Sequence, residues 1–165
     1  MFLRALLAFL MVPVVVAGIV PYLLSNYDPY KADGIFFGIF ILAFGLSILL
    51  WCVRDFYVSG KGTLAPWDPP KKLVTVGLYQ YARNPMYVGV IFILFGWVII
   101  TASPIVLGFT LFLTLAFHLR VKIHEEPWAE KNFTSEWLIY KNNVPRWLPQ
   151  LKGYYPKKHS KISKN

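Results

Sequence analysis

Long apolar runs separated by short polar segments dominate the chain. The first run covers residues 2–24 and the second covers residues 34–53. A helix needs about 20 apolar residues to cross the hydrocarbon core of a bilayer, so each run predicts one membrane-spanning helix. The first run is longer than the apolar core of a signal peptide, and no small-residue cleavage motif follows it. We therefore expect a retained helix, kinked near Pro13.

A third apolar stretch, residues 86–119, is too long for a single span. Its middle holds Thr101-Ala102-Ser103-Pro104, and a Ser-Pro pair is a signal for a turn followed by a helix start. We therefore expect a tight hairpin of two helices, residues 86–101 and 104–121. The predicted fold class is an all-α integral membrane protein with about four transmembrane helices.

The polar segments indicate how the chain lies in a membrane. Residues 54–83 contain five Lys/Arg and two Asp together with several Gly and Pro, which predicts a loop. Residues 120–165 contain ten Lys/Arg and four acidic residues, and they hold most of the formal net charge of +9. Basic segments beside apolar spans are typical of the cytoplasmic membrane face and its anionic lipids. This placement favours membrane lipids, and not nucleic acid, as partners of the basic residues.

Composition agrees with a membrane protein, because only 15% of the residues are charged, whereas soluble domains average about 25%. Near the C-terminus, residues 128–142 place Phe133, Trp137 and Tyr140 on one face of a predicted amphipathic, interfacial helix. We expect three units, which are an N-terminal helix pair (1–53), a functional core (54–150) and a basic tail (151–165).

The stretch 77–89 joins the basic loop to the hairpin and carries the most unusual chemistry. Asn84 followed by Pro85 is typical of a helix start, with the Asn side chain as the N-cap. The free N–H groups of such a start bind anions, and Arg83 adds further donors beside them. An alternative interpretation is a membrane-interface anchor, because Tyr and Arg are enriched where helices meet lipid headgroups.

The hairpin brings the start of its first helix close to the end of its second. We therefore expect Arg83, Asn84 and Tyr87 to lie near a set of polar residues that includes His118, Arg120, Lys122 and Glu125. A salt bridge from Arg83 to Glu125 or Glu126 is the structural interpretation. A pocket for a zwitterionic ligand is the functional one. No metal site is predicted, because His118, His124 and Glu125 lack a metal-binding spacing. The single cysteine, Cys52, excludes an internal disulfide.

Three blocks in order resemble a known family. Residues 77–89 match the pattern G-x-Y-x-x-x-R-[HN]-P-x-Y-x-G of the isoprenylcysteine carboxyl methyltransferase family and its phospholipid methyltransferase relatives. Glu125-Glu126, then Phe133, Trp137, Tyr140 and Val144-Pro145-Arg146-Trp147-Leu148-Pro149, are similar to the family's C-terminal ending. The approach through residues 60–70 resembles that of bacterial members, so the expected location is the bacterial inner membrane.

The resemblance implies an S-adenosylmethionine-dependent methyltransferase whose cofactor pocket is closed on the cytoplasmic side by the loop and the C-terminal helix. The cofactor contacts that it implies are Lys71, Leu73, Val74, Tyr79, Asn84, Pro85, Met86, Tyr87 and Glu125. Arg83, the donor beside the helix start, is the further expected cofactor contact. A substrate-binding Arg of the family aligns with Val121, so Arg120 is the expected substrate contact. Two other departures are Asn84 in place of His and Thr134 in place of Gly.

The methyl acceptor is expected to be lipophilic and to enter from the bilayer, as the carboxylate of an isoprenylcysteine or an analogous small molecule or lipid. An anionic acceptor needs no catalytic base, and none is assigned. For an amine or thiol acceptor, His118 or His124 is the candidate base. Two alternatives are an NADPH-dependent membrane reductase related to sterol reductases and a non-enzymatic membrane scaffold.

Overall fold

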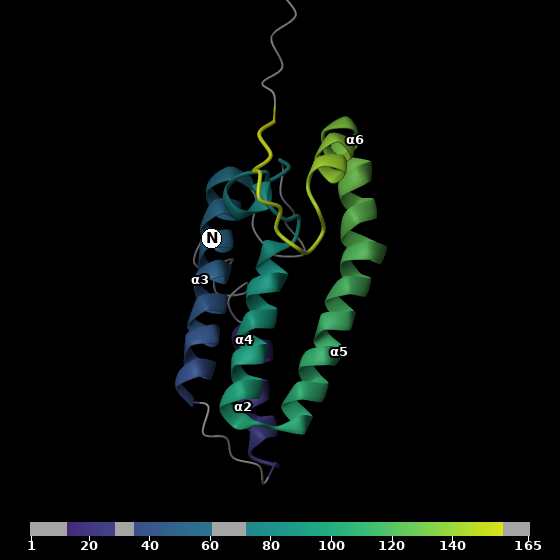
Figure 1. Cartoon of the computed structure of the whole chain (residues 1–165). Coiled ribbons are helices and arrows are strands. Elements are labelled where there is room, and N and C mark those ends of the chain that lie inside the picture. The colour runs from purple at the N-terminus through teal and green to yellow at the C-terminus, as the bar shows by residue number, and fades with distance from the viewer. Residues whose placement is uncertain (1–12, 29–34, 61–71, 157–165) are drawn as a thin grey trace, which may run out of the picture.

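The structure is a computed structural model that describes residues 13–28, 35–60 and 72–156 (Figure 1). Within these residues the regular secondary structure is entirely helical. In chain order the elements are η1 (Val15–Ile19), α2 (Val20–Ser25), α3 (Ile35–Gly60), η2 (Gly77–Gln80), α4 (Pro85–Thr101), α5 (Pro104–Arg120), η3 (Val121–Glu125) and α6 (Glu126–Asn143). The predicted all-α class is thus confirmed for the described part of the chain.

The α4–α5 hairpin has the predicted turn, and its helix bounds agree with the prediction to within one residue. Ala102 adopts the left-handed conformation (φ 48°), and its N–H donates to Val98 O at 2.8 Å. Ser103 then caps α5 by accepting a hydrogen bond from the Val106 N–H at 3.2 Å. Asp28, which follows the end of α2 at Ser25, accepts a hydrogen bond from the Ser103 hydroxyl at 2.5 Å. A residue distant in sequence therefore completes the cap.

Helix α3 is longer than the apolar run that predicts it. The sequence indicated a loop from Arg54 onward, but the helix continues to Gly60. The reason is local, because no proline occurs between Ile35 and Gly60 and a helix can carry Arg54 and Asp55 at its polar end. Most of the remaining predicted loop, residues 61–71, lies outside the described residues.

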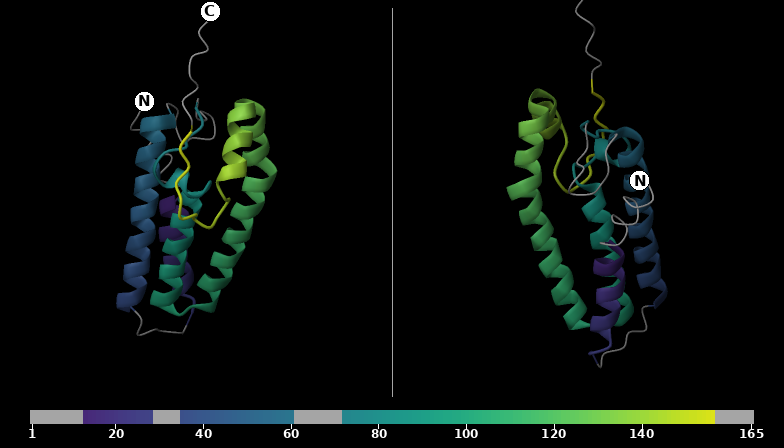
Figure 2. Two further views of the ribbon diagram at one scale, coloured as in Figure 1. Left: turned by 45° about the horizontal axis from the view of Figure 1, so that its top comes forward. Right: turned by 180° about the vertical axis from the view of Figure 1, so that it is seen from behind.

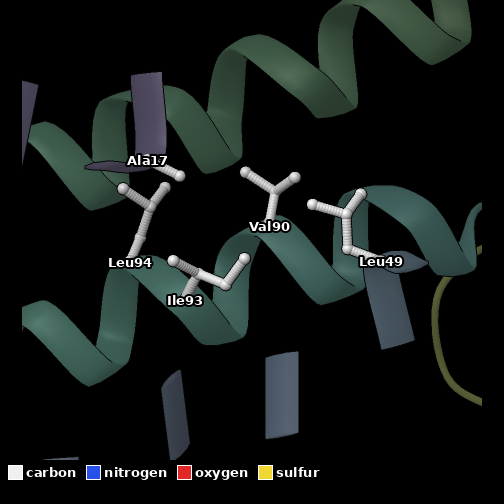
Figure 3. Close-up of a cluster of buried hydrophobic side chains, with 5 residues drawn as sticks. All are labelled: Ala17, Leu49, Val90, Ile93 and Leu94. Atoms are coloured by element: carbon white, nitrogen blue, oxygen red, sulfur yellow. The ribbon is translucent and has the colours of Figure 1, made fainter. Parts of the chain in front are cut away.

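Helices α3 and α4 meet along a seam of four glycines, Gly38, Gly45, Gly89 and Gly96. A Cβ at Gly45 would lie 2.6 Å from Gly89 O, and one at Gly38 would lie 2.9 Å from Gly96 O. No side chain fits there, so the two backbones pack directly, as is common between membrane helices. Beside the seam lies a buried cluster of Ala17, Leu49, Val90, Ile93 and Leu94 (Figure 3).

Two of the described helical segments are long and apolar enough to cross a membrane, Ile35–Asp55 and Pro104–Asn143. Two apolar helical segments, Val15–Ser25 and Pro85–Thr101, are shorter. Residues 1–12 of the first predicted span lie outside the described residues. The expected kink near Pro13 is therefore untested. The described helix does depart from α geometry at η1, where the Val20 N–H bonds to Val15 O.

Helix α5 runs through the π-helical turn η3 into α6, and the ribbons of α4 and α5 diverge away from their hairpin turn (Figures 1 and 2). The predicted apolar face of α6 is confirmed, because Trp137 and Tyr140 are buried and Phe133 packs against them. Thr134 interrupts α6 with φ 34° and ψ −102°. This is the position where the resembled family commonly has Gly, and glycine adopts positive φ without the steric cost that Thr has.

Candidate functional site

The C-terminal segment, residues 144–154, folds back onto the loop before α4 (Figure 2). The backbone N–H of Arg83 donates to Pro145 O at 2.9 Å, and the backbone N–H of Gln150 donates to Tyr81 O at 3.0 Å. Tyr154 N–H donates to Gln80 O at 3.0 Å. Residues separated by more than 60 positions in sequence therefore share one hydrogen-bonded layer at the N-terminal end of α4.

The Asn84 side chain binds the C-terminal segment and does not cap α4. Helix α4 begins at Pro85 as predicted, but the Asn84 side chain makes no cap and donates instead to Arg146 O at 3.2 Å. The predicted side-chain N-cap is therefore wrong, because the amide is used in a long-range contact. The N–H groups of Met86 and Tyr87, in the first turn, are left without a side-chain cap. Such uncapped N–H groups attract anions.

Tyr87 and Glu125 meet across the open end of the hairpin, as the sequence predicts. The Tyr87 hydroxyl donates to Glu125 Oε1. The same oxygen accepts from Arg120 Nε at 2.9 Å. One carboxylate oxygen thus joins the start of α4 to the end of α5. The Glu125 side chain remains 37% exposed, so its other oxygen can receive a further donor.

Glu126, the next residue, binds two other arginines. Its Oε1 lies 3.0 Å from Arg83 Nη1 and 2.7 Å from Arg146 Nε, and its Oε2 accepts from Arg146 Nη2 at 2.9 Å. The hydrogen bonds to Glu126 raise the pKa of Arg146 above its usual value. Of the two predicted salt-bridge partners of Arg83, Glu126 is therefore the correct one. Arg83 also lies over the Trp137 ring, 5.5 Å from its centroid.

An aromatic group surrounds the Tyr87 ring. The ring centroid of Phe117, on α5, lies 4.7 Å from that of Tyr87. Trp147 of the C-terminal segment contacts the Tyr87 ring edge-on, with 6.4 Å between the centroids. Trp147 also stacks on His118, at 6.1 Å and 29° between the ring planes. Its indole N–H donates to His118 Nδ1 at 3.2 Å. His124, in contrast, is exposed.

The other predicted cofactor contacts fall on one side of this arrangement. Val74 and Tyr79 form a buried cluster with Cys52, against which Met86 packs. Leu73 packs on the α6 cluster instead. The pKa of Tyr79 is raised well above its usual range by burial and by its neighbours Cys52, Tyr140, Asp55 and Glu125. Lys71 lies outside the described residues.

The predicted substrate contact Arg120 is exposed, whereas Val121, aligned with the family's Arg, is fully buried. Sequence reasoning placed Trp147 within a motif but gave it no role, and it did not single out Asp55. Oδ2 of Asp55 is buried without a hydrogen-bond partner. A Cβ at Gly77 would lie 1.8 Å from that oxygen, which explains why Gly77, with φ 58°, stands there.

Among the described residues, no group of three His, Cys, Asp or Glu is placed to hold a metal ion. Comparison with known proteins gives a consistent picture. Residues 34–136 match the family model described as phospholipid methyltransferase. Curated relatives named protein-S-isoprenylcysteine O-methyltransferase match at 37% identity, over 83 residues in Xenopus laevis and over 82 residues in Mus musculus and Homo sapiens.

These matches cover 49% of this chain, but only 28% of the Xenopus and human proteins and 29% of the mouse protein. The matched region thus spans less than a third of the length of these relatives. No solved structure matches the chain. The family match extends over more than half of the chain, from the start of α3 into α6, and it contains the Tyr87–Glu125 contact. It confirms the resemblance that the three sequence blocks predict: the chain belongs to the phospholipid methyltransferase family.

Proposed function

We propose that this protein is an S-adenosylmethionine-dependent membrane methyltransferase that acts on a lipophilic acceptor. The observation that carries the proposal is the contact of Tyr87 and Arg120 with Glu125, beside the uncapped start of α4. It places a carboxylate and a set of free backbone N–H groups at one end of the hairpin. The family match and the names of the relatives support methyl transfer as the reaction.

The residues at this end fit the methyl donor. A carboxylate suits the uncapped N–H groups of Met86 and Tyr87, and an amino or hydroxyl group suits Glu125. On the Glu126 side, the buried donors Arg83 Nε and Trp137 Nε1 have no hydrogen-bond partner. Val74, Tyr79 and Met86 provide an apolar wall. When bound, the donor supplies an activated methyl group on a sulfonium.

The protein's own contribution is to orient the acceptor and exclude water. An acceptor that arrives as an anion needs no base, so alignment of the reacting groups supplies much of the rate. Arg120 uses Nε for Glu125, and with its side chain 57% exposed its terminal nitrogens are able to face an anionic group. This favours a carboxylate acceptor attached to a lipophilic chain, such as an isoprenylcysteine.

We further propose that four apolar segments cross the bilayer, namely the N-terminal run, α3, α4 and α5. The basic segments and the Tyr87–Glu125 end then lie on the cytoplasmic side. The expected division into residues 1–53, 54–150 and 151–165 remains part of this proposal. Cysteine-accessibility labelling in inverted and right-side-out vesicles tests it: single cysteines near Asp28 and near Gln150 should react from opposite sides.

Calorimetry on the detergent-purified protein tests the function directly. We expect binding of S-adenosylmethionine and of its demethylated product, and at least a tenfold loss of affinity in Glu125→Gln. Glu136→Gln is the matched control, because Glu136 is exposed on α6. NADPH binding without binding of the methyl donor would replace the proposal by the reductase interpretation.

Methyl transfer is then measured with acceptors that differ in one group: S-farnesyl-N-acetylcysteine, its amide, and a farnesyl amine. Labelled methyl on the carboxylate probe alone is the expected result. Transfer only to the amine would keep the methyltransferase assignment but reject the carboxylate acceptor. Absence of both binding and transfer, with a folded protein, would favour a scaffold.

A further inference from the structure

The hydrogen bond between Trp147 and His118 fixes where the imidazole carries its proton. The indole N–H of tryptophan is a donor only. Because it points at His118 Nδ1 at 3.2 Å, Nδ1 must offer a lone pair. A neutral imidazole has one N–H, so that proton is on Nε2. Nδ1 is then occupied as an acceptor, and Nε2 carries the proton that the ring can donate.

The surroundings hold this pair in one orientation. Trp147 stacks on His118 and also contacts Tyr87, so the indole lies between the start of α4 and the end of α5. On either side of Trp147 the chain is anchored, by Arg146 to Glu126 and by the Gln150 N–H to Tyr81 O. The imidazole therefore has a defined partner on a segment that is itself fixed.

The position also places His118 in the proposed site. His118 lies on the same helix as Phe117 and Arg120, and Phe117 packs on the Tyr87 ring. Tyr87 in turn bonds to Glu125. Trp147 contacts both His118 and Tyr87, so it links His118 to the residues that carry the proposed function. It is also the residue that the sequence offered as a base for amine or thiol acceptors.

We propose that Trp147 is a positioning residue that holds His118 as the Nε2–H tautomer, so that His118 serves the acceptor as a hydrogen-bond donor and not as a base. The imidazole in this state has no free lone pair to accept a proton. A methyl acceptor that is already an anion, such as a carboxylate, can accept a hydrogen bond from His118 Nε2–H. An amine or thiol that must first lose a proton gains nothing from His118. The catalytic part of this inference rests on the proposed methyltransferase function, whereas the tautomer does not.

Nitrogen NMR of imidazole-labelled protein at pH 8 tests the tautomer without any methyl donor or acceptor. The chain has three histidines, and His118→Gln identifies the signal of interest. We expect an unprotonated Nδ1 and a protonated Nε2 in the wild type, and a mixture of both tautomers in Trp147→Phe. Trp128→Phe is the matched control, because Trp128 packs on Phe133 and makes no contact with His118 among those described. A protonated Nδ1 in the wild type, or no change in Trp147→Phe, would overturn the proposal.

Kinetics with the carboxylate probe separates donor from base. His118→Phe removes the donor and should lower kcat/KM roughly tenfold, which corresponds to a single hydrogen bond to a charged group. His118→Gln keeps an N–H donor and should restore most of this loss. A base role predicts instead that both variants lose on the order of 10²–10⁴-fold. A loss of that size in both variants would reject the donor role, even if NMR shows the expected Nε2–H tautomer. A wild type that binds no S-adenosylmethionine rejects the proposed function and with it the catalytic part of the inference, while the NMR result decides the tautomer by itself.

Discussion

Glu125 and Glu126 are adjacent in sequence, yet they hold different parts of the molecule together. Glu125 bonds to Tyr87 and Arg120, whereas Glu126 pairs with Arg83 and Arg146. Successive residues on a helix point about 100° apart, so the two side chains leave the helix in different directions. The two carboxylates lie where η3 passes into α6, and π-helical turns frequently mark functional sites.

Glu125 is more exposed than Glu126, so replacing each carboxylate by a neutral amide should have different effects. In Glu126→Gln, two arginines lose their counter-charge, and the Arg83 side chain is only 9% exposed. Breaking a buried ion pair on one side costs about 3 kcal/mol of stability, so the melting temperature should fall clearly. Glu125→Gln should cost much less stability and mainly affect ligand binding. Equal melting temperatures for Glu126→Gln and the exposed control Glu136→Gln would contradict this division.

Thr134→Gly should stabilise the protein. Thr134 has φ 34°, a region that costs a β-branched residue on the order of 1–3 kcal/mol and that glycine adopts freely. Thermal or denaturant unfolding in detergent measures the difference. Lys131→Gly, an exposed position earlier in α6, is the control, because glycine inside a regular helix costs roughly 0.5–1 kcal/mol. Destabilisation of similar size in both variants would show that the kink at Thr134 does not carry strain.

Gly45→Ala should destabilise the α3–α4 pair. The added methyl group would lie 2.6 Å from Gly89 O and 2.7 Å from Ile93 N, and backbone atoms cannot move aside cheaply. Overpacking of this kind costs about 1–3 kcal/mol. Gly108→Ala on α5 is a matched control with nothing within 4 Å, and it should be neutral or slightly stabilising. A neutral Gly45→Ala would mean that the two helices are further apart than described.

Asp28→Ala should weaken the hairpin turn from a distance. Asp28 Oδ2 accepts the Ser103 hydroxyl and also lies 3.4 Å from the Ile105 N–H, at the start of α5. Loss of an N-cap contact costs about 1 kcal/mol. The expected readout is faster amide exchange in the first turn of α5. Ser25→Ala, which removes only a local bond to Tyr22 O, should leave that turn unchanged.

The hairpin could be predicted because its signals are local. The Ser103-Pro104 pair marks a turn by its own backbone preferences, and the apolar run around it sets the helix lengths. Antiparallel packing then brings Tyr87 towards Glu125 without further information. The membership of the family followed from three ordered motifs in the same way.

What the sequence could not indicate depends on long-range competition between partners. Asn84 has the pattern of an N-cap, but Arg146 O, 62 residues away, takes its amide. The donation from Trp147 to His118 and the cap that Asp28 provides likewise join residues with no periodic relation. The helical continuation from Arg54 to Gly60 was missed because charge ends an apolar run without ending a helix.

The glycine seam has a consequence for the route by which a lipid-like molecule travels. Between Gly38 and Gly45 on one helix and Gly96 and Gly89 on the other, a single methyl group would strike backbone atoms. A hydrocarbon tail is at least as wide as a methyl group, so it cannot pass between α3 and α4 where these glycines meet. The proposed lipophilic acceptor therefore has no passage to Tyr87 between these glycines, and the side where the ribbon of α5 diverges from α4 is left for its approach (Figure 2).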